Sequence, residues 1–319
     1  MLHVNKIREY KETYITLLKL KNIDATELFD SVIELDDARK SNQKKADEFL
    51  SKGKQLANEI GDLYKTGRSK KANILKEDSL AIKEKIKILQ KTQSELEIKI
   101  QDILVEIPNV PHSSVPFGTS DADNIAVKEV GKKPILMPNS KPHWELASQY
   151  GLIDFELGNK ITGSGFPVYT NQGARLQRAL ITYFLEKNIA AGYTEYLPPH
   201  LVNETSGFST GNLPDKEGQM YHATQDDLYL IPTAEVPVTN FFRDLIIKDF
   251  PIKCTAYTPC FRREAGSYGK DVRGLNRLHQ FDKVEIVQIQ HPDKSYETLE
   301  DMVGHVSSIL DELELPFRI

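Results

Sequence analysis

Residues 257–290, YTPCFRREAGSYGKDVRGLNRLHQFDKVEIVQIQ, are the most informative segment of this chain about its fold. It contains most of two strand-like segments, Thr255–Glu264 and His279–Gln290, and a loop of about Ala265–Arg277 lies between them. Two strands joined in this way predict an antiparallel β-hairpin. Hairpin loops usually have about 2–5 residues, so a loop this long, rich in glycine and basic residues, is typical of a functional segment.

The alternation of side chains along the two strands predicts a chemically useful face. On the first strand, Arg262 and Glu264 share one face, and Phe261 and Arg263 share the other. The return strand places four side chains on one face: His279, Phe281, Lys283 and Glu285. An arginine can hold a phosphate or a carboxylate through two hydrogen bonds, an aromatic ring can stack on a base, and a glutamate can hold an ammonium group. This face suits a nucleotide that reacts at phosphorus. The alternative is an exposed sheet face with alternating charges.

The sequence around the hairpin predicts a mixed domain. A helix is expected at 172–188, further strands at 193–197 and 228–231, and further helices at 233–248 and 293–313. Strands separated by irregular loops and helices predict an α+β domain built on an antiparallel sheet.

The first hundred residues have a different pattern, which is typical of a coiled coil. In a heptad series from Leu28 to Leu63, eight of eleven positions are apolar, and in a second series from Ala72 to Ile103 eight of ten are apolar. A short segment with a glycine, 65–70, separates the two series. We therefore expect a long antiparallel helical hairpin whose arms are each about 55–60 Å long.

Composition excludes several classes of protein. The 319 residues have 39% hydrophobic content, below the usual value of roughly 45–50%, which a long solvated helical arm would explain. The net charge of −5 excludes a globally basic nucleic-acid binder. Cys254 and Cys260 are too few for a disulfide framework or a four-cysteine zinc site, so we expect a reducing, cytoplasmic compartment. We find no signal peptide and no apolar run long enough for a membrane span, so no membrane association is expected.

A local basic segment lies at the expected tip of the hairpin. Residues 65–76, KTGRSKKANILK, contain five cations and no acid: Lys65, Arg68, Lys70, Lys71 and Lys76. One interpretation is an ordinary solvated helical face. The other is an arm that follows a nucleic-acid backbone, because neutralising phosphates requires cations without neighbouring acids.

Several motifs together resemble one family. FRRE at 261–264, the glycine-rich loop and HQFDKVE at 279–285 look like the second signature motif of class II aminoacyl-tRNA synthetases, and their wording resembles the bacterial seryl-tRNA synthetase family. LIPTAE at 230–235 resembles that family's serine-binding segment. The helix and strand that end at Pro198-Pro199 resemble its first motif, which forms the dimer interface, and the N-terminal hairpin resembles its tRNA-binding arm. The resemblance implies a tRNA-binding coiled-coil arm at 1–108 and a class II catalytic domain at 109–319.

The resemblance also implies a role for individual residues. Arg262 is expected to be the catalytic residue, holding the α-phosphate of ATP and the serine carboxylate. The implied serine-binding residues are Thr233, Ala234, Glu235, Arg262 and Glu285, with Glu285 on the ammonium group. The implied ATP-binding residues are Arg262, Arg263, Glu264, Leu278 and Phe281, with Glu264 on the adenine side and Phe281 stacked on the ring. The loop at 265–277 would meet the acceptor end of the tRNA.

The implied reaction has two steps. Serine is activated by ATP to seryl-adenylate, and the seryl group then passes to tRNA(Ser), with tRNA(Sec) as a further candidate. The implied partners are L-serine, ATP, tRNA(Ser) and a second copy of the chain in a homodimer. Mg²⁺ would neutralise the phosphates of ATP, and no metal ligands are expected within these residues.

The end of the chain adds an expectation of its own. It stops at Leu315–Ile319, inside an apolar strand-like run, before the family's third motif. We therefore expect the catalytic domain to be incomplete, and activity to belong to a longer protein. Two alternatives remain at this point: a non-catalytic tRNA-binding fragment or paralogue, and a ligase that charges a carrier protein with an amino acid. The long arm weighs against the second, and the intact hairpin residues weigh against the first.

Overall fold

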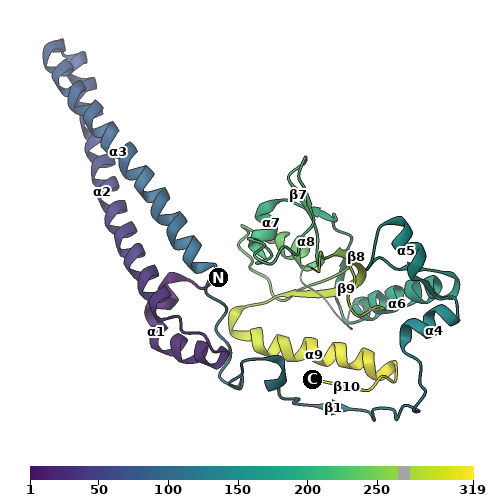
Figure 1. The fold of residues 1–319 in the computed structure, drawn as a ribbon. Coiled ribbons are helices and arrows are strands. Elements are labelled where there is room, and N and C mark those ends of the chain that lie inside the picture. Colours follow the sequence, from purple (N-terminus) through teal and green to yellow (C-terminus); the bar gives the residue numbers. More distant parts are fainter. Residues whose placement is uncertain (265–273) are drawn as a thin grey trace. The chain divides into compact units, whose positions relative to one another are not determined.

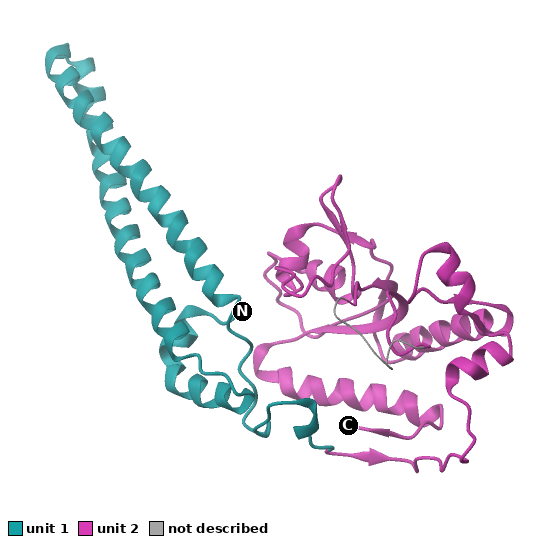
Figure 2. Ribbon diagram, viewed as in Figure 1, with its two compact units in different colours: residues 1–126 teal, residues 127–319 magenta. Residues whose placement is uncertain are grey.

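The chain divides into two compact units. The computed structural model describes residues 1–264 and 274–319. Unit 1 comprises residues 1–126 and unit 2 comprises residues 127–319 (Figure 2). Among the helices that lie in the described ranges, none has both the length and the apolar character that a membrane span requires.

Unit 1 is dominated by two long helices, α2 (Thr26–Lys65) and α3 (Ser69–Leu104), which pack along each other (Figure 1). They have 40 and 36 residues, which corresponds to about 60 and 54 Å. The chain reverses at Gly67, whose φ of 74° is readily adopted only by glycine. The packing of α2 along α3 confirms the predicted antiparallel hairpin. It could be predicted because heptad periodicity is a local property of the sequence.

The hydrophobic core of unit 1 lies at the base of this hairpin. There a helix that the sequence analysis did not predict, α1 (Val4–Leu18), packs against the two long ones. The buried core residues come from the three helices and the short segments beside them: Ile7, Ile15, Leu18, Ala25, Phe29, Val32, Ile100, Leu104 and Ile107. Two helices alone cannot enclose a wide core, and α1 contributes Ile7, Ile15 and Leu18 to it. A 3-10 turn follows α1 at Lys19–Lys21, and another lies at Asp121–Asp123.

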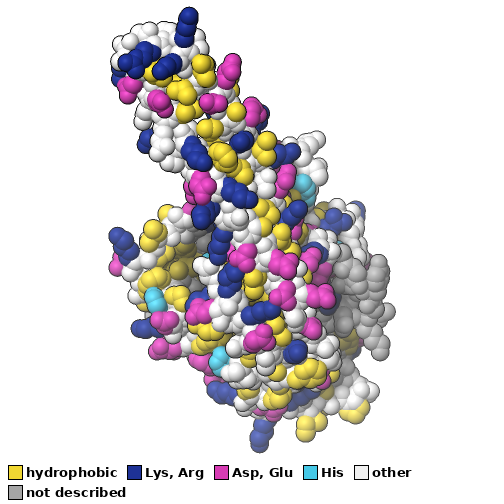
Figure 3. Space-filling view, turned by 90° about the vertical axis from the view of Figure 1, so that its left-hand side faces the viewer, with side chains coloured by type: hydrophobic (Ala, Val, Ile, Leu, Met, Phe, Trp, Pro, Cys, Tyr) yellow, Lys and Arg dark blue, Asp and Glu magenta, His cyan; other side chains and the backbone are white. Residues whose placement is uncertain are grey.

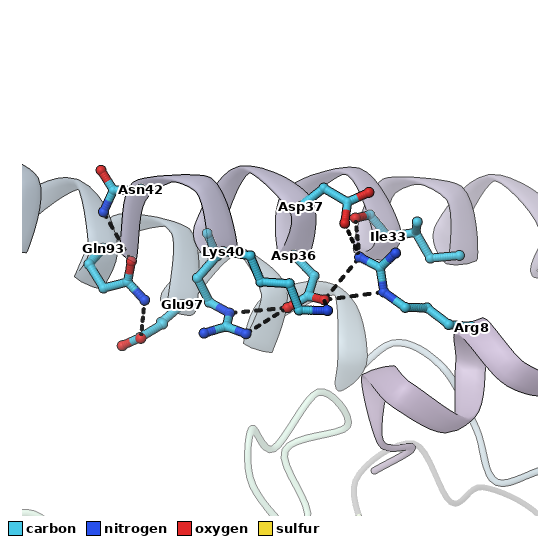
Figure 4. Close-up of polar contacts among 9 residues, drawn as sticks. Arg8, Ile33, Asp36, Asp37, Lys40, Asn42, Gln93 and Glu97 are labelled. Atoms are coloured by element: carbon cyan, nitrogen blue, oxygen red, sulfur yellow. Dashed lines mark hydrogen bonds and ion pairs between the residues drawn. The ribbon is translucent and has the colours of Figure 1, made fainter. Parts of the chain in front are cut away.

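A polar contact sits inside the hairpin where both heptad series are interrupted. Asn42 is buried and its Nδ2 donates to the Leu89 carbonyl oxygen at 2.9 Å and to Gln93 Oε1 at 3.0 Å. Gln93 Nε2 in turn donates to Glu97 at 2.8 Å (Figure 4). Because an amide at a core position is satisfied only when its partner lies opposite, this contact favours one register of the two helices.

Unit 2 is built around a long antiparallel hairpin of two ten-residue strands, β8 (Ile252–Phe261) and β9 (Gln280–Ile289). The strand β4 (Thr194–Tyr196) adds to β8 in parallel, so the main sheet has the order β4-β8-β9. Helix α6 (Asn171–Ala190) contacts both long strands. The predicted α+β class and helix 172–188 are confirmed.

Shorter elements complete unit 2. Three smaller sheets pair β1 with β10, β2 with β3, and β5-β7-β6. The strands are β1 (Glu129–Val130), β2 (Ile153–Asp154), β3 (Val168–Tyr169), β5 (Leu201–Val202), β6 (His222–Ala223), β7 (Leu228–Leu230) and β10 (Phe317–Arg318). The remaining helices are α4 (His143–Gln149), α5 (Phe155–Ile161), α7 (Glu204–Ser209), α8 (Glu235–Asn240), the 3-10 turn Pro292–Lys294 and α9 (Ser295–Glu312). The helix predicted at 293–313 is confirmed in α9.

The helix predicted at 233–248 is wrong over most of its length, because α8 ends at Asn240. The Asn240 side chain donates to the carbonyl oxygens of Val236 at 2.8 Å and of Ser206 at 3.0 Å, and Arg243 donates to Asn240 Oδ1 at 2.7 Å. Asp244 then takes a φ of 62°, outside the right-handed helical region. Contacts with a residue 34 positions away therefore override the local helical pattern.

Candidate active site

The β8–β9 hairpin positions the candidate site through its register. Cys260 pairs with Phe281, Thr258 with Lys283 and Ala256 with Glu285. Residues directly opposite each other in an antiparallel pair point to the same face. The small side chains of β8 are buried at 0–1% exposure, so the longer side chains of β9 have room to project on this face. Over part of it, Ala234 and Val238 pack against Cys254 and Ala256.

Glu285 is the centre of a polar cluster on this face. Its Oε2 accepts hydrogen bonds from the Thr233 hydroxyl at 2.6 Å and from the Glu235 backbone N–H at 3.1 Å. Its Oε1 lies 3.0 Å from Lys283 Nζ, and the side chain is 16% exposed. Lys283 also donates to the Thr233 hydroxyl oxygen at 2.9 Å. The structure therefore joins the predicted segment 233–235 to Glu285, about fifty residues later in the sequence.

Lys283 is a member of this cluster that the predicted set of site residues omitted. The alternation along β9 had placed it on the correct face, between Phe281 and Glu285. Lys283 could not be assigned to the site from the sequence, because the sequence alone does not show that Thr233 and Glu285 would both lie within reach of its ammonium. Glu235 was among the predicted serine-binding residues, but it is exposed, and only its backbone N–H takes part in the cluster.

Arg262 lies at the end of the hairpin, over the ring of Phe281. The guanidinium carbon is 5.2 Å from the ring centroid, a distance at which a cation and an aromatic face attract each other. The predicted alternation of 261–264 is wrong in one respect, because β8 ends at Phe261 and Glu264 has a φ of 48°. Arg262 and Glu264 are thus held by loop contacts instead of by the strand.

Two other residues of the predicted ATP site, Arg263 and Glu264, contact other segments of the chain. The Arg263 backbone N–H donates to the Gln219 carbonyl oxygen at 2.8 Å, and its side chain is exposed. Glu264 Oε2 forms an ion pair with Arg277 Nη1 at 3.0 Å, while Leu278 is buried at 7% exposure. The rest of the predicted tRNA-contacting loop, 265–273, lies outside the described residues.

Asp282 anchors the opposite face of β9 and so fixes the strand that carries the site. It accepts a hydrogen bond from the Tyr257 hydroxyl at 2.7 Å and another from Gln177 of α6. Burial, together with the hydrogen bond to Asp282, raises the pKa of Tyr257 to about 12, so the phenol stays protonated and keeps donating.

Within 1–264 and 274–319, no three acidic, histidine or cysteine side chains gather in a way that could hold a metal ion. A metal that acts at this face would need ligands from its substrate or from other residues.

Comparison with known proteins decides the family. Residues 1–111 match the seryl-tRNA synthetase N-terminal domain, and residues 219–319 match the tRNA synthetase class II core domain (G, H, P, S and T). The serine–tRNA ligase of Salinibacter ruber is 44% identical over 320 residues, covering all of this chain and 75% of that protein. This chain belongs to the seryl-tRNA synthetase family. It is therefore a ligase of the aminoacyl-tRNA synthetase class, with the function of a serine–tRNA ligase.

Other relatives agree in sequence and in structure. The serine–tRNA ligase of a Hydrogenobaculum species is 41% identical, and the alignment covers this whole chain and 76% of that protein. Among solved structures, the seryl-tRNA synthetase from Pyrococcus horikoshii complexed with ATP has a TM-score of 0.86 at 31% identity, over all of this chain and 76% of that one. The chain thus spans about three quarters of the length of these relatives. The expected family and class II fold are confirmed.

Proposed function

We propose that the face of β8–β9 described above is where serine meets ATP, and that the cluster around Glu285 binds the amino acid. The observation that carries this proposal is the pairing of a mostly buried carboxylate with Thr233 and Lys283 on the same strand face as Phe281. Phe281 and Glu285 are four residues apart on β9, or about 13 Å. This distance leaves room for separate nucleotide and amino-acid subsites.

The proposed serine subsite uses Glu285 for the ammonium group, together with Thr233, Ala234 and Glu235. Lys283 already neutralises one oxygen of Glu285, so the substrate ammonium would share this carboxylate with a cation of the protein. The substrate ammonium would be the fourth donor to this carboxylate, after Thr233, the Glu235 N–H and Lys283, and the ammonium of Lys283 would repel it unless it is placed strictly. We therefore expect this carboxylate to take a small amino acid.

The proposed ATP subsite uses Arg262, Arg263, Glu264, Leu278 and Phe281. Arg262 would leave the ring of Phe281 and hold the α-phosphate and the serine carboxylate together, while the adenine stacks on the ring. Glu264 would contact the adenine side. In the first step a serine carboxylate oxygen attacks the α-phosphorus and pyrophosphate leaves. In the second step the terminal ribose hydroxyl of tRNA attacks the seryl carbonyl carbon, loses its proton and releases AMP. Positioning and charge stabilisation carry such reactions.

Mg²⁺ would enter this site with the phosphates of ATP. Its usual ligands are oxygen atoms, and it is commonly bound through phosphates with one or two carboxylates and water. Since the described residues form no group of three side chains that could hold a metal ion, the phosphates of ATP would provide most of the ligands of Mg²⁺. The ion would supply charge neutralisation while Arg262 orients the α-phosphate.

The proposed tRNA contact is the hairpin arm, within a tRNA-binding domain at 1–108 that precedes a catalytic domain at 109–319. Basic side chains gather at the tip of the hairpin in Figure 3, where the sequence has Lys65, Arg68, Lys70 and Lys71. Such a tip suits the phosphate backbone of tRNA(Ser).

We also propose a cytoplasmic homodimer. Leu176 on α6 and Leu197 after β4, in the segment that resembles the family's first motif, are 56% and 81% exposed. Interfaces commonly contain large exposed apolar side chains, and a second copy of the chain would bury these two.

The deciding experiment is amino-acid-dependent exchange between ATP and pyrophosphate, measured on the full-length protein that carries this chain. We expect exchange with serine and none with threonine, alanine or cysteine at equal concentration. Exchange with another amino acid but not with serine would contradict the proposed serine subsite.

A further inference from the structure

His279 is wedged between two aromatic side chains at the start of β9. Its ring stacks on Phe166 with centroids 5.2 Å apart and an interplanar angle of 8°, and it meets Tyr221 edge-on at 6.4 Å. The His279 backbone N–H donates to the Gly165 carbonyl oxygen at 2.9 Å. Gly165 has a φ of 84°, and a Cβ atom added there would overlap the imidazole. The segment 165–166 therefore fits closely around this one ring.

The same residue holds both backbone polar groups of Arg262. The Arg262 N–H donates to the His279 carbonyl oxygen at 2.9 Å, and His279 Nδ1 lies 3.1 Å from the Arg262 carbonyl oxygen. Since a carbonyl oxygen only accepts, the contact with Arg262 is a hydrogen bond in the forms of His279 that carry a proton on Nδ1. The Tyr221 hydroxyl oxygen lies 3.0 Å from the same nitrogen and is its second polar partner.

These contacts matter because Arg262 is the first residue beyond the β8 strand. The last pair of the β8–β9 ladder is Phe261 with Gln280, so the next residues on each side, Arg262 and His279, face each other, and His279 holds the Arg262 peptide. The side chain of an arginine can bind a phosphate in a defined geometry only if its own backbone is fixed.

We propose that His279 is the positioning residue for Arg262: its Nδ1–H, held in place by Phe166 and Tyr221, fixes the Arg262 peptide so that the guanidinium meets the reacting phosphate. This inference rests on the role proposed above for Arg262. His279 transfers no proton in this role. The required donor is present both in the neutral tautomer with a proton on Nδ1 and in the imidazolium form.

The test compares two substitutions of similar size in the full-length protein, His279→Asn and His279→Leu. Asparagine can place an N–H near the position of Nδ1, whereas leucine has no donor. We expect His279→Leu to lower kcat for serine-dependent exchange about 10- to 100-fold, in keeping with the cost of a misplaced catalytic group. His279→Asn should stay within about fivefold of the wild type, with an unchanged pH profile over about pH 6–9 because the amide donor does not titrate there. The melting temperature and tRNA affinity monitor folding.

Three results would overturn the inference. One is wild-type kcat in a folded His279→Leu variant. Another is an equal loss in both variants at unchanged melting temperature, which would assign the effect to the ring instead of the donor. The third is a pH profile that changes in His279→Asn, which would indicate proton transfer.

If His279→Leu does not fold, His279→Asp replaces it, because an aspartate carboxylate has the shape of the asparagine amide but only accepts hydrogen bonds. A kcat of His279→Asp equal to that of His279→Asn would then overturn the inference. A failure of the proposed function is distinguishable, since the unsubstituted protein would then show no serine-dependent exchange.

Discussion

The ammonium of Lys283 lies 3.0 Å from the carboxylate of Glu285, on the same face of β9 and two residues earlier in the strand. This pair makes the proposed amino-acid subsite nearly neutral before a substrate arrives. Removing one partner of such a pair leaves the charge of the other uncompensated, which costs more free energy than replacing both partners by apolar groups.

The first prediction therefore concerns Glu285→Gln. The amide keeps the shape of the side chain but removes the negative charge, so Lys283 and the substrate ammonium would repel each other with nothing between them. We expect the KM for serine in pyrophosphate exchange to rise about 10- to 100-fold, in line with about 1.5–3 kcal/mol for a charged hydrogen bond. Glu300→Gln, on the exposed surface of α9, is the matched control and should leave KM unchanged. Equal KM values for the two variants would refute the role of Glu285.

The tip of the arm gives the second prediction. Replacing Arg68, Lys70 and Lys71 by glutamine should weaken tRNA binding while serine-dependent exchange stays intact. The slope of log affinity against log salt should fall in magnitude by about 2–3 if all three cations neutralise phosphates. The control neutralises three exposed lysines of unit 2: Lys132, Lys133 and Lys160. An unchanged salt slope in the tip variant, or a loss of exchange, would speak against the proposed arm.

The third prediction follows from Asp36, a buried carboxylate in unit 1 with a side chain that is 3% exposed (Figure 4). Burial by itself would raise the pKa of Asp36, but hydrogen bonds from Lys40, Arg39 and Arg8 outweigh it and lower the pKa from 3.8 to about 2. A carboxyl group whose pKa is lower in the folded state stabilises the fold above its unfolded pKa. This stability is lost as the pH falls from about 4 towards 2, and it amounts to about 2 kcal/mol.

Urea unfolding followed by circular dichroism measures this effect. Asp36→Asn should lower the free energy of unfolding by about 2 kcal/mol at neutral pH and should flatten its pH dependence below pH 4. Asp37→Asn is the control, because Asp37 also contacts Arg8 but is 62% exposed. Similar losses in both variants would mean that the burial of Asp36 is not the cause.

The fourth prediction contrasts two helical glycines of unit 2. A Cβ atom at Gly173, in the first turn of α6, would overlap the backbone carbonyl of Leu152, which cannot move cheaply. At Gly304, in the middle of α9, a Cβ atom would meet nothing within 4 Å. We expect Gly173→Ala to destabilise unit 2 by about 1–3 kcal/mol and Gly304→Ala to stabilise it by about 0.5–1 kcal/mol. Thermal unfolding would show opposite shifts; shifts of the same sign would refute the close approach of α6 to Leu152.

Elements whose pattern is local could be predicted from the amino-acid sequence. Heptad spacing predicted α2 and α3, and alternation along β9 placed Lys283 and Glu285 on one face. A period of 3.5 or 2 residues can be read without knowing what lies opposite, because it reflects a single buried stripe or face. The motifs also indicated the family, which the relatives confirm.

How distant segments meet could not be predicted from the sequence and is seen in the folded protein. The sequence did not show that Thr233 would donate to Glu285, nor that Asn42 would face Gln93 in the hairpin. It also extended α8 too far and continued the strand alternation through Glu264, where long-range hydrogen bonds and a positive φ prevail. Local propensities amount to tenths of a kcal/mol per residue, whereas a buried polar group without a partner costs about 1–3 kcal/mol. Where the two compete, the partner that folding brings from far along the chain determines the conformation.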